Sequence, residues 1–474
     1  MTDVTRLTAV DAVDLLRRRR VSPVELVNAA IRRIEATDPA VNALPIRCFD
    51  RALSGARAVE RDHDLHRSNP ASLCGLPVAI KDMTDVAGVR GTYGSPLFAD
   101  RVPQHSDIVV ETLERRGALI LAKSNTPEFA SAGGRNTTNR LFGATRNPWN
   151  TALSCGGSSG GSAVAVASGQ AWLATGTDLG GSLRQPASFC SVVGLRPTPG
   201  RVARSALLPN DTLCVAGPIA RTVADVALML DAMVGEVAGD PLSLPAPPER
   251  YLLRAQAPHA PKRVAFSPDL GLCPVATEVA DICRDAALLL TGCGTIVERD
   301  SPDLSGVRAI LDVLRPAWLA AHWGHLVETD GDKLPPSFRA RLDAGLVFSA
   351  QNVWEAEKKR AVLAQRVVRF FDRYDLLACP TAPIAAFPVE TERIADIDGA
   401  PLEAESDWML LTYAISLAGC PALSLPCGFT SDGRPVGLQL IGPPRSEGQL
   451  IAMAALLESL IELPRKVPID PVRA

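Results

Sequence analysis

Apolar positions recur at helical spacing in the N-terminal part of the chain. The first 36 residues predict two helices, and the second opens at "SPVE", which begins at Ser22. Ser22 can cap the free N–H groups of this helix, Pro23 suits its first turn, and Glu25 completes a capping box. Four arginines at residues 17–20 stand between the helices. We interpret them as a solvated helix end rather than as a nucleic-acid patch.

From about residue 74 the pattern changes to short aliphatic runs that alternate with helical segments. "GLPVAIKD" (75–82) and "ALILAKSN" (118–125) have the composition of buried strands, and "SDIVVETLERRG" (106–117) that of a capped helix ending at glycine. Buried strands separated by helices are typical of a mostly parallel or mixed sheet with helices on both faces. The pattern therefore predicts an α/β protein.

The later part of the chain has a less regular pattern. A proline-rich connection covers residues 239–266. We interpret it as an ordered segment that joins two parts of one fold, with an inter-domain linker as the alternative. Residues 354–374 have a helical pattern and run into "DLLACPTAPIAAFP", which predicts a buried strand followed by a proline turn.

Composition narrows the class of protein. The 474 residues are 47% hydrophobic and 21% charged, with a net charge of -3. This profile is typical of a soluble globular protein and offers no basic excess for nucleic acid. The apolar runs are too short to cross a bilayer, and the N-terminus lacks the apolar segment of a secretory signal. Eleven cysteines without CxxC pairs fit reduced thiols, so we expect a cytoplasmic protein that binds neither nucleic acid nor membrane.

A glycine- and serine-rich run, "CGGSSGGSAVAVASG" at residues 155–169, stands directly before small apolar residues. It is not a Walker A loop, because no lysine follows Gly161, and no three of its glycines have the dinucleotide-binding spacing. It does match the G-x-S-x-G elbow of a histidine-dependent α/β-hydrolase, with Ser158 as the nucleophile. The last 149 residues contain no histidine, which disfavours this alternative.

Two further segments supply groups that a serine nucleophile needs. Ser182 follows two glycines in "GTDLGGSLRQPASFC" (176–190), and Lys81 ends an apolar strand, where burial favours a neutral amine. Lys81, Ser158 and Ser182 in this order, with glycine-rich turns around both serines, resemble the pattern of the amidase signature family. The resemblance is strong over about residues 70–235 and resumes in "GCPALSLPCGF" and "GRPVGLQLIGP" (419–443).

The resemblance implies one amidase-signature-like domain over residues 1–474, with an α/β/α fold and a large mixed central sheet covered by helices on both faces. The expected parts of this domain are the N-terminal helices (1–70), a signature core (70–235), a variable substrate-cleft region (236–410) and the C-terminal part of the core (411–474).

The resemblance also implies a role for each residue of the site. Ser182 would be the acylated nucleophile, Ser158 a bridging serine that follows a cis peptide bond from Gly157, and Lys81 the base. A neutral lysine can take the proton of a serine, whereas an ammonium cannot. The oxyanion hole would be formed by the backbone N–H groups of Leu179, Gly180, Gly181 and Ser182.

Neighbouring residues receive structural roles. We expect Asp178 and Arg184 to form an internal pair that holds the nucleophile turn, with Ser159 supporting it. Lys123 ends a similar strand, but none of the motifs that carry the family resemblance contains it, so we give it no catalytic role. Cys155 and Cys190 flank the motifs and are expected to pack rather than to react.

No metal or cofactor is expected. The histidine pairs His63/His66 and His322/His325 have a spacing that could hold a metal, but neither pair has a third ligand nearby. We therefore interpret all four as surface residues.

The leading functional hypothesis is a hydrolase that cleaves C–N bonds of small linear amides through an acyl-enzyme on Ser182. Esters and carbamates, including urethanes, are chemically close because they present a similar acyl carbon. The alternative is the glutaminase (A) subunit of a tRNA-dependent amidotransferase complex, which the family includes. That subunit usually carries an "RYG"-like block where this chain has "DKLPPSFRARLDAGLVFS" (332–349), and this departure disfavours it.

Substrate identity is expected to depend on variable regions at about 126–140, 200–215 and 300–400. Within the first of these, Ala130 and Ser131 are the candidate substrate-binding residues. We expect a small-molecule substrate and a monomer or homodimer.

Overall fold

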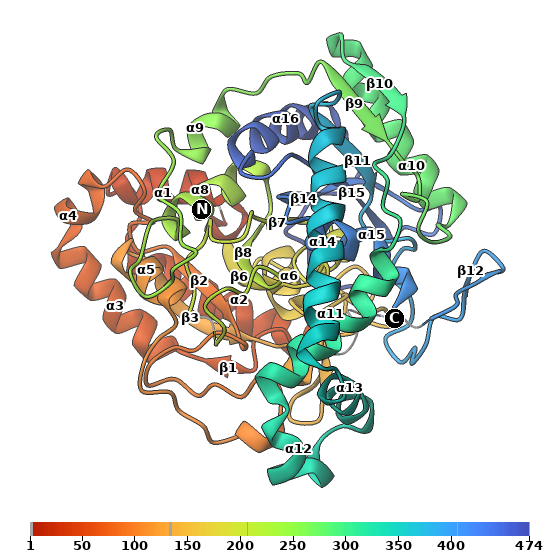
Figure 1. Cartoon of the computed structure of the whole chain (residues 1–474). Helices are drawn as coiled ribbons and strands as arrows, with labels where there is room; N and C mark the ends of the chain where they lie inside the picture. The colour runs from red at the N-terminus through yellow and green to blue at the C-terminus, as the bar shows by residue number, and fades with distance from the viewer. Residues whose placement is uncertain (1–2, 132–134, 206, 405, 474) are drawn as a thin grey trace.

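A mixed sheet of eleven strands runs through the middle of the molecule (Figure 1). The computed structural model describes residues 3–131, 135–205, 207–404 and 406–473. The strands of the sheet, in spatial order, are β1 (Ile46–Arg47), β3 (Leu119–Ser124), β2 (Pro77–Lys81), β6 (Leu173–Asp178), β8 (Val215–Ala220), β7 (Val193–Arg196), β14 (Ala422–Phe429), β15 (Pro435–Ile441), β11 (Leu376–Pro380), β9 (Arg263–Phe266) and β10 (Ile296–Arg299). Two-stranded ribbons are formed by β4 (Thr138–Asn139) with β5 (Gly143–Ala144) and by β12 (Asp396–Ile397) with β13 (Ala400–Pro401).

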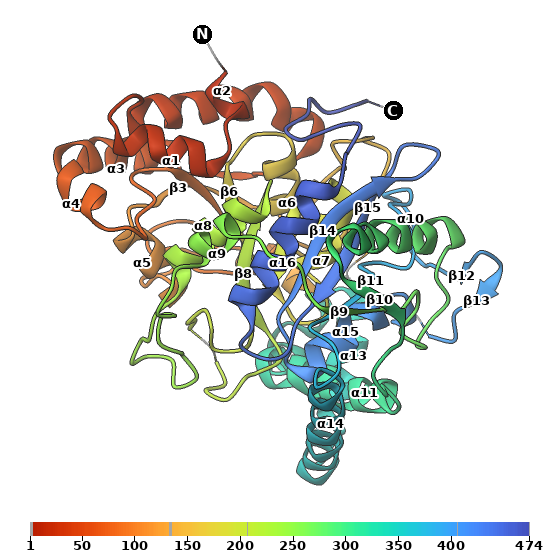
Figure 2. The same cartoon turned by 90° about the horizontal axis from the view of Figure 1, so that it is seen from above.

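Helices flank the sheet on both faces, which confirms the predicted α/β/α arrangement (Figures 1 and 2). In chain order they are α1 (Ala9–Arg17), α2 (Pro23–Val41), α3 (Phe49–Arg61), α4 (His63–Ser68), α5 (Ile108–Arg115), α6 (Gly160–Ala167), α7 (Arg184–Cys190), α8 (Val223–Met233), α9 (Tyr251–Gln256), α10 (Thr277–Leu288), α11 (Val307–Trp323), α12 (His325–Asp330), α13 (Pro336–Leu346), α14 (Ala350–Phe370), α15 (Leu410–Ala418) and α16 (Glu447–Leu460). Among the described residues, no helix has the length and apolar character needed to cross a membrane.

The two predicted N-terminal helices are α1 and α2, and the predicted capping box opens α2. Ser22 Oγ accepts a hydrogen bond from the Glu25 N–H at 3.1 Å, and the Glu25 carboxylate accepts one from the Ser22 N–H at 2.7 Å. Helix α2 ends at Val41, later than the predicted end at residue 36, and Asn42 closes it in a left-handed conformation.

Three parallel strands bring the predicted motifs to one edge of the sheet. β2 lies between β3 and β6, and Lys81 pairs in register with Ser124 of β3. β6 runs parallel to β2 and ends at Asp178. Because parallel strands end at the same edge of a sheet, the end of β2 and the turn after β6 meet there, which is where ligands bind in open α/β sheets.

The glycine- and serine-rich run leads into α6, in which every residue is buried. This helix packs against β2, β3, β6 and β8. A Cβ on Gly161 would lie 2.4 Å from the Asn125 backbone nitrogen, so only glycine allows this close approach. The run is therefore a tightly packed segment of the core, although its composition resembles that of a linker.

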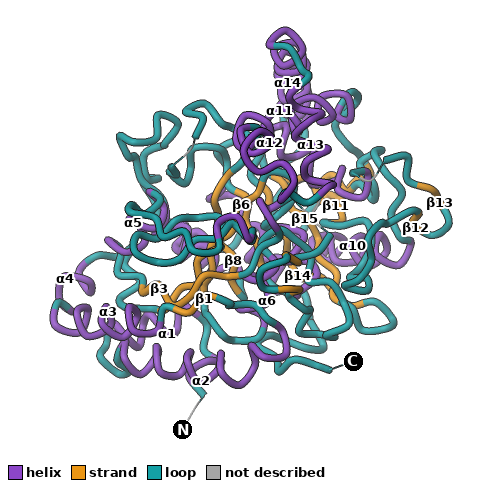
Figure 3. The backbone as a smooth tube through the Cα atoms, turned by 90° about the horizontal axis from the view of Figure 1, so that it is seen from below, coloured by secondary structure: helices purple, strands orange, loops and turns teal. Residues whose placement is uncertain are grey.

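Residues 307–370, which belong to the part of the chain with a less regular sequence pattern, form a group of helices at one end of the sheet. Helices α11, α12 and α13 contact one another, and α14 packs along α11 (Figures 1 and 3). The predicted helix at residues 354–374 corresponds to α14, and the strand predicted after it is β11. The proline-rich connection contains α9, which packs on α8 and α16.

Candidate active site

Lys81, the last residue of β2, is fully buried at the edge of the sheet where the motifs meet. Its Nζ lies 2.7 Å from Ser158 Oγ and 2.8 Å from Thr177 Oγ1. Burial lowers the pKa of Lys81 to about 7, because a buried amine is disfavoured in its charged form. A substantial share of the protein therefore carries a neutral Lys81 at neutral pH, in hydrogen-bond contact with a serine.

The two serine turns are tied together by Ser159. The Gly157–Ser158 peptide bond is cis, as the family resemblance implies. The Ser159 N–H donates to the Ser182 carbonyl at 3.2 Å, and Ser159 Oγ donates to the Thr177 carbonyl at 3.3 Å. Ser159 therefore supports the turn, as predicted, while Ser158 contacts Lys81.

A buried ion pair holds the turn that carries Ser182. Arg184 donates to both carboxylate oxygens of Asp178, at 2.9 and 3.0 Å, and both side chains are fully buried. Burial raises the pKa of Asp178, but the neighbouring charges of Arg184 and Arg196 lower it by a larger amount. The net pKa of Asp178 is therefore well below its usual value. Arg184 also donates to the Thr412 carbonyl at 3.1 Å, which fixes the turn to α15. The predicted internal pair is therefore present.

One predicted oxyanion donor is already engaged. The Gly181 N–H donates to Asp178 Oδ1 at 2.8 Å, so it does not point freely at a substrate oxygen. The prediction that the Gly181 N–H is an oxyanion donor is therefore corrected, because this N–H is bonded to Asp178 within the turn. Leu179, Gly180 and Ser182 line the cavity and stay the candidate donors.

The two glycines before Ser182 are required by close neighbours. A Cβ on Gly180 would lie 2.0 Å from Tyr413 Cε1, and one on Gly181 would lie 2.4 Å from Thr412 Oγ1. Gly181 also has a φ of +117°, which L side chains rarely adopt. Helix α15 therefore packs directly against the backbone of the nucleophile turn.

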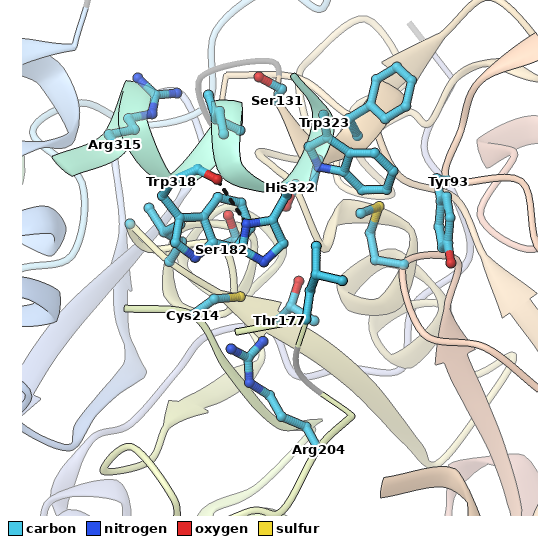
Figure 4. Close-up of a pocket in the computed structure, with 18 of the residues that line it drawn as sticks. Tyr93, Ser131, Thr177, Ser182, Arg204, Cys214, Arg315, Trp318, His322 and Trp323 are labelled. Atoms are coloured by element: carbon cyan, nitrogen blue, oxygen red, sulfur yellow. Dashed lines mark hydrogen bonds between the residues drawn. The ribbon is translucent and has the colours of Figure 1, made fainter. Parts of the chain in front are cut away.

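A cavity of about 440 Å³ is lined by both serines. Figure 4 shows Ser182 at this cavity. Ser158, Thr177, Leu179, Gly180 and Ser182 contribute to its lining. The three variable regions line it as well, and Ala130 and Ser131 are both included. The structure thus brings the predicted serines, three of the four predicted oxyanion residues (Ser182 among them) and the candidate substrate-binding residues to one cavity.

Aromatic side chains form much of the cavity wall. Tyr93 packs edge-on against Phe98 and Trp323, with ring centroids 5.4 and 5.5 Å apart. The ring centroid of Phe129 lies 5.1 Å from that of Trp323, and Phe129 also lines the cavity. Such a wall favours apolar or aromatic groups of a ligand.

Both His322 and His325 line the cavity. His325 is exposed, as expected, whereas the surface assignment of His322 is wrong because this side chain is half-buried in the cavity wall. His322 stacks on Trp318 with ring centroids 3.8 Å apart, and its Nδ1 lies 2.8 Å from the Trp318 carbonyl oxygen (Figure 4). A carbonyl only accepts, so Nδ1 carries the proton of this contact. Burial lowers the pKa of His322. The sequence analysis placed this segment in the variable region at 300–400, but its pattern did not indicate which side chains of α11 and α12 reach the cavity.

Several cavity residues were not predicted from the sequence. They are Met83, Tyr93, Thr177, Cys214, Arg315, Trp318, Met409 and Tyr413. Thr177 stands directly before the predicted Asp178 and could have been found by the position of "GTD" at the end of a strand. The others come from loops and helices that only the fold brings to the cavity.

Lys123 is a second buried lysine at the end of a neighbouring strand. Its Nζ forms an ion pair with Asp82 at 2.8 Å, and both side chains are buried. Asp82 in turn accepts a hydrogen bond from the Thr92 N–H at 3.2 Å. Lys123 therefore has a carboxylate partner and a structural role, whereas Lys81 faces two hydroxyl groups.

Cysteine chemistry is not supported near the motifs. Cys155 is fully buried, and burial raises its pKa to about 12. Burial also raises the pKa of Cys190 well above its usual value. A thiol with a raised pKa is a poor nucleophile at neutral pH, which agrees with the predicted packing role. Among the described residues, no three histidine, cysteine or acidic side chains form a group that could hold a metal ion.

An α/β fold in which a buried lysine contacts Ser158, with Ser182 lining the same cavity, is the arrangement expected of a hydrolase with a serine nucleophile. The family model for Amidase matches residues 25–451. The chain therefore belongs to the amidase signature family, whose members hydrolyse amides.

The relatives of the chain include proteins of two functional descriptions. One is the A subunit of the glutamyl-tRNA(Gln) amidotransferase of Moorella thermoacetica, to which the chain is 37% identical over 98% of each sequence. The chain is also 34% identical to an acylamidase of Rhodococcus erythropolis, over 98% of this chain and 97% of the relative. Among solved structures, a bacterial aryl acylamidase superposes with a TM-score of 0.87 at 28% identity, over 96% of each chain. These similarities support amide hydrolysis and leave two substrate classes open.

Proposed function

We propose that the protein hydrolyses small linear amides through an acyl-enzyme on Ser182. The observation that carries this proposal is the contact of fully buried Lys81 with Ser158 Oγ at 2.7 Å, beside the glycine-rich turn of Ser182. An amine whose pKa is lowered to about 7 can act as a base at neutral pH. The reaction needs no cofactor.

In the first half-reaction, neutral Lys81 takes the proton of Ser158 while Ser158 takes the proton of Ser182. Ser182 Oγ then attacks the carbonyl carbon of the amide, and the negative oxygen is stabilised by backbone N–H groups from Leu179, Gly180 and Ser182. Each such donor contributes about 10²- to 10³-fold to kcat in comparable sites. As the C–N bond breaks, Ser158 returns a proton to the leaving nitrogen.

In the second half-reaction, water replaces the amine. The same pair of groups takes a proton from this water as it attacks the acyl carbon. Collapse of the second tetrahedral intermediate returns the proton to Ser182 and releases the carboxylic acid. Esters and carbamates, including urethanes, enter the same cycle because the attacked carbon is similar.

The cavity lining supports an amide with an apolar or aromatic group. Tyr93, Phe98, Phe129 and Trp323 supply an aromatic wall. No Asp or Glu is found among the described residues that line the cavity. A substrate with a free ammonium group, such as glutamine, would find no carboxylate partner there, which is unfavourable in a partly enclosed site.

The glutaminase subunit of an amidotransferase complex stays the second candidate, because a relative with that description is 37% identical to the chain. The lack of a carboxylate in the described lining favours the small-amide hydrolase. We further propose that the protein works on small molecules in the cytoplasm as a monomer or homodimer, without nucleic acid or membrane.

A substrate panel tests the proposal. The values of kcat/KM would be measured for acetanilide, a p-nitroanilide, benzamide, a phenyl ester, a carbamate and L-glutamine. We expect anilides or aryl amides to be cleaved at least about 100-fold faster than glutamine. Efficient glutamine hydrolysis with no cleavage of anilides would favour the glutaminase instead.

A further inference from the structure

Arg315 is a cavity cation without a carboxylate partner among the described residues. It belongs to α11 and lines the cavity together with Trp318 and His322. These three residues follow one another at i, i+3 and i+7, so they share one face of the helix, and Figure 4 shows all three at the pocket. The guanidinium carbon of Arg315 lies 5.4 Å from the ring centroid of Tyr413. That ring contact leaves the N–H donors of Arg315 available for an anion.

The other cavity arginine differs in this respect. Arg204 forms a close ion pair with the buried carboxylate of Asp211. Asp211 also accepts a hydrogen bond from Trp318 Nε1 at 3.0 Å. The charge of Arg204 is thus compensated inside the protein, while Arg315 lines the cavity and has no described carboxylate partner.

Tyr413 supplies a second polar group without a protein partner. Only 3% of the residue is exposed, yet it lines the cavity, and its hydroxyl makes no hydrogen bond to a described residue. The Cζ atom, which bears this hydroxyl, would lie 2.2 Å from a Cβ on Gly180. The hydroxyl end of the ring therefore lies beside the nucleophile turn. Burial raises the pKa of Tyr413, so the phenol keeps its proton and can donate it in a hydrogen bond.

We propose that Arg315 and Tyr413 form a subsite for a carboxylate, and that the preferred substrates are amides that carry a carboxylate group in addition to an apolar part. This inference deepens the proposed amide hydrolysis and rests on it. The subsite offers a guanidinium fork and a phenol, both suited to a carboxylate. The aromatic wall of Tyr93, Phe98 and Trp323 would hold the apolar part.

Two pairs of anilides test the subsite and separate the two places where the carboxylate can be attached. In the first pair the amine half carries it: 4-acetamidobenzoate is compared with 4-methylacetanilide. In the second pair the acyl half carries it: succinanilate is compared with 4-methylpentananilide. The release of the arylamine gives kcat/KM for each compound, and the ratio of charged to neutral substrate is the quantity of interest.

In the wild-type protein we expect a ratio of about 10 to 100 for at least one pair, because a charge-assisted contact in a partly buried site is strong. Arg315→Gln should bring this ratio close to one, mainly through KM. Tyr413→Phe should lower it by about three- to tenfold. Arg299→Gln is the matched control, since Arg299 is an exposed arginine on the edge strand β10, and it should keep the wild-type ratio. Ratios near one for both pairs in the wild type, or an unchanged ratio in Arg315→Gln, would overturn the proposal.

Calorimetric binding to Ser182→Ala separates the subsite from the proposed reaction. We expect the charged member of the preferred pair to bind about tenfold or more tightly than its neutral partner. This difference should disappear in Ser182→Ala/Arg315→Gln. Equal affinity of the charged and neutral compounds for Ser182→Ala would overturn the subsite even if amides are hydrolysed. A protein that hydrolyses no amide but binds the charged compounds more tightly would instead refute the proposed function and leave the subsite supported.

Discussion

Lys81 Nζ lies 2.7 Å from Ser158 Oγ, while Lys123, on the neighbouring strand, lies 2.8 Å from a carboxylate oxygen of Asp82. Both lysines are fully buried and both come from the carboxyl end of a parallel strand. They differ in the groups that they face, which are hydroxyls for Lys81 and a carboxylate for Lys123. This difference separates a candidate base from a structural ion pair.

Replacing each lysine by methionine should therefore give opposite results. Lys81→Met should lower kcat/KM by several orders of magnitude with a nearly unchanged unfolding midpoint, because no buried charge loses its partner. Lys123→Met leaves Asp82 buried and unpaired, which costs about 3–5 kcal/mol of stability. Thermal unfolding and the anilide assay, run on both variants, check this prediction. A stable and fully active Lys81→Met would contradict it.

The activity should depend on the protonation of Lys81. Its pKa is lowered to about 7 by burial, and the neutral form is the reactive one. The value of kcat/KM should therefore rise with pH through about 7 and level off on the alkaline side. The measurement is a profile of kcat/KM between about pH 5 and 9 for a neutral anilide. A profile that falls over this range as the pH rises would exclude an amine base.

Removing the charge of Asp178 should destabilise the protein. Asp178→Asn leaves the buried guanidinium groups of Arg184 and Arg196 without their carboxylate. We expect a loss of about 3–5 kcal/mol, measured as a lower unfolding midpoint. The matched control is Asp281→Asn, which breaks a half-exposed pair with Arg284 and should cost about 0–1 kcal/mol. Equal midpoints for the two variants would show that the buried pair does not hold the turn.

The histidines distinguish the lysine mechanism from a histidine-dependent elbow at Ser158. Alanine at His66, His105 or His259 should leave kcat/KM within about threefold of the wild-type value. These residues lie outside the cavity lining, and substitutions away from a functional site have small effects. His322→Ala removes part of the cavity wall and should raise KM more than it lowers kcat. A histidine variant without turnover, together with an active Lys81→Met, would favour the elbow.

The candidate residues that lie in local motifs could be identified from the sequence. Lys81, Ser158 and Ser182 stand at strand ends or glycine-rich turns, and their proposed roles came from the family resemblance. The buried role of Asp178 and Arg184 also followed from their positions on either side of Ser182. Parallel pairing of β2 and β6 then brings these motifs to one edge of the sheet.

Residues that reach the cavity through tertiary packing could not be predicted in this way. His322 and Arg315 lie on a helix whose sequence pattern gives no sign of the sheet edge that it approaches. Tyr413 comes from α15, far along the chain, and meets the site only because Gly180 leaves space for its ring. The engagement of the Gly181 N–H by Asp178 likewise depends on the exact shape of the turn.

We propose Ser182 as the nucleophile and Ser158 as the bridging serine. The reaction of the protein with a fluorophosphonate, followed by intact mass measurement and peptide mapping, distinguishes these two roles. We expect one adduct per chain, located on Ser182, with none in Ser182→Ala and slower labelling in Ser158→Ala. An adduct on Ser158 that forms at full stoichiometry in Ser182→Ala would show that Ser182 is not the nucleophile.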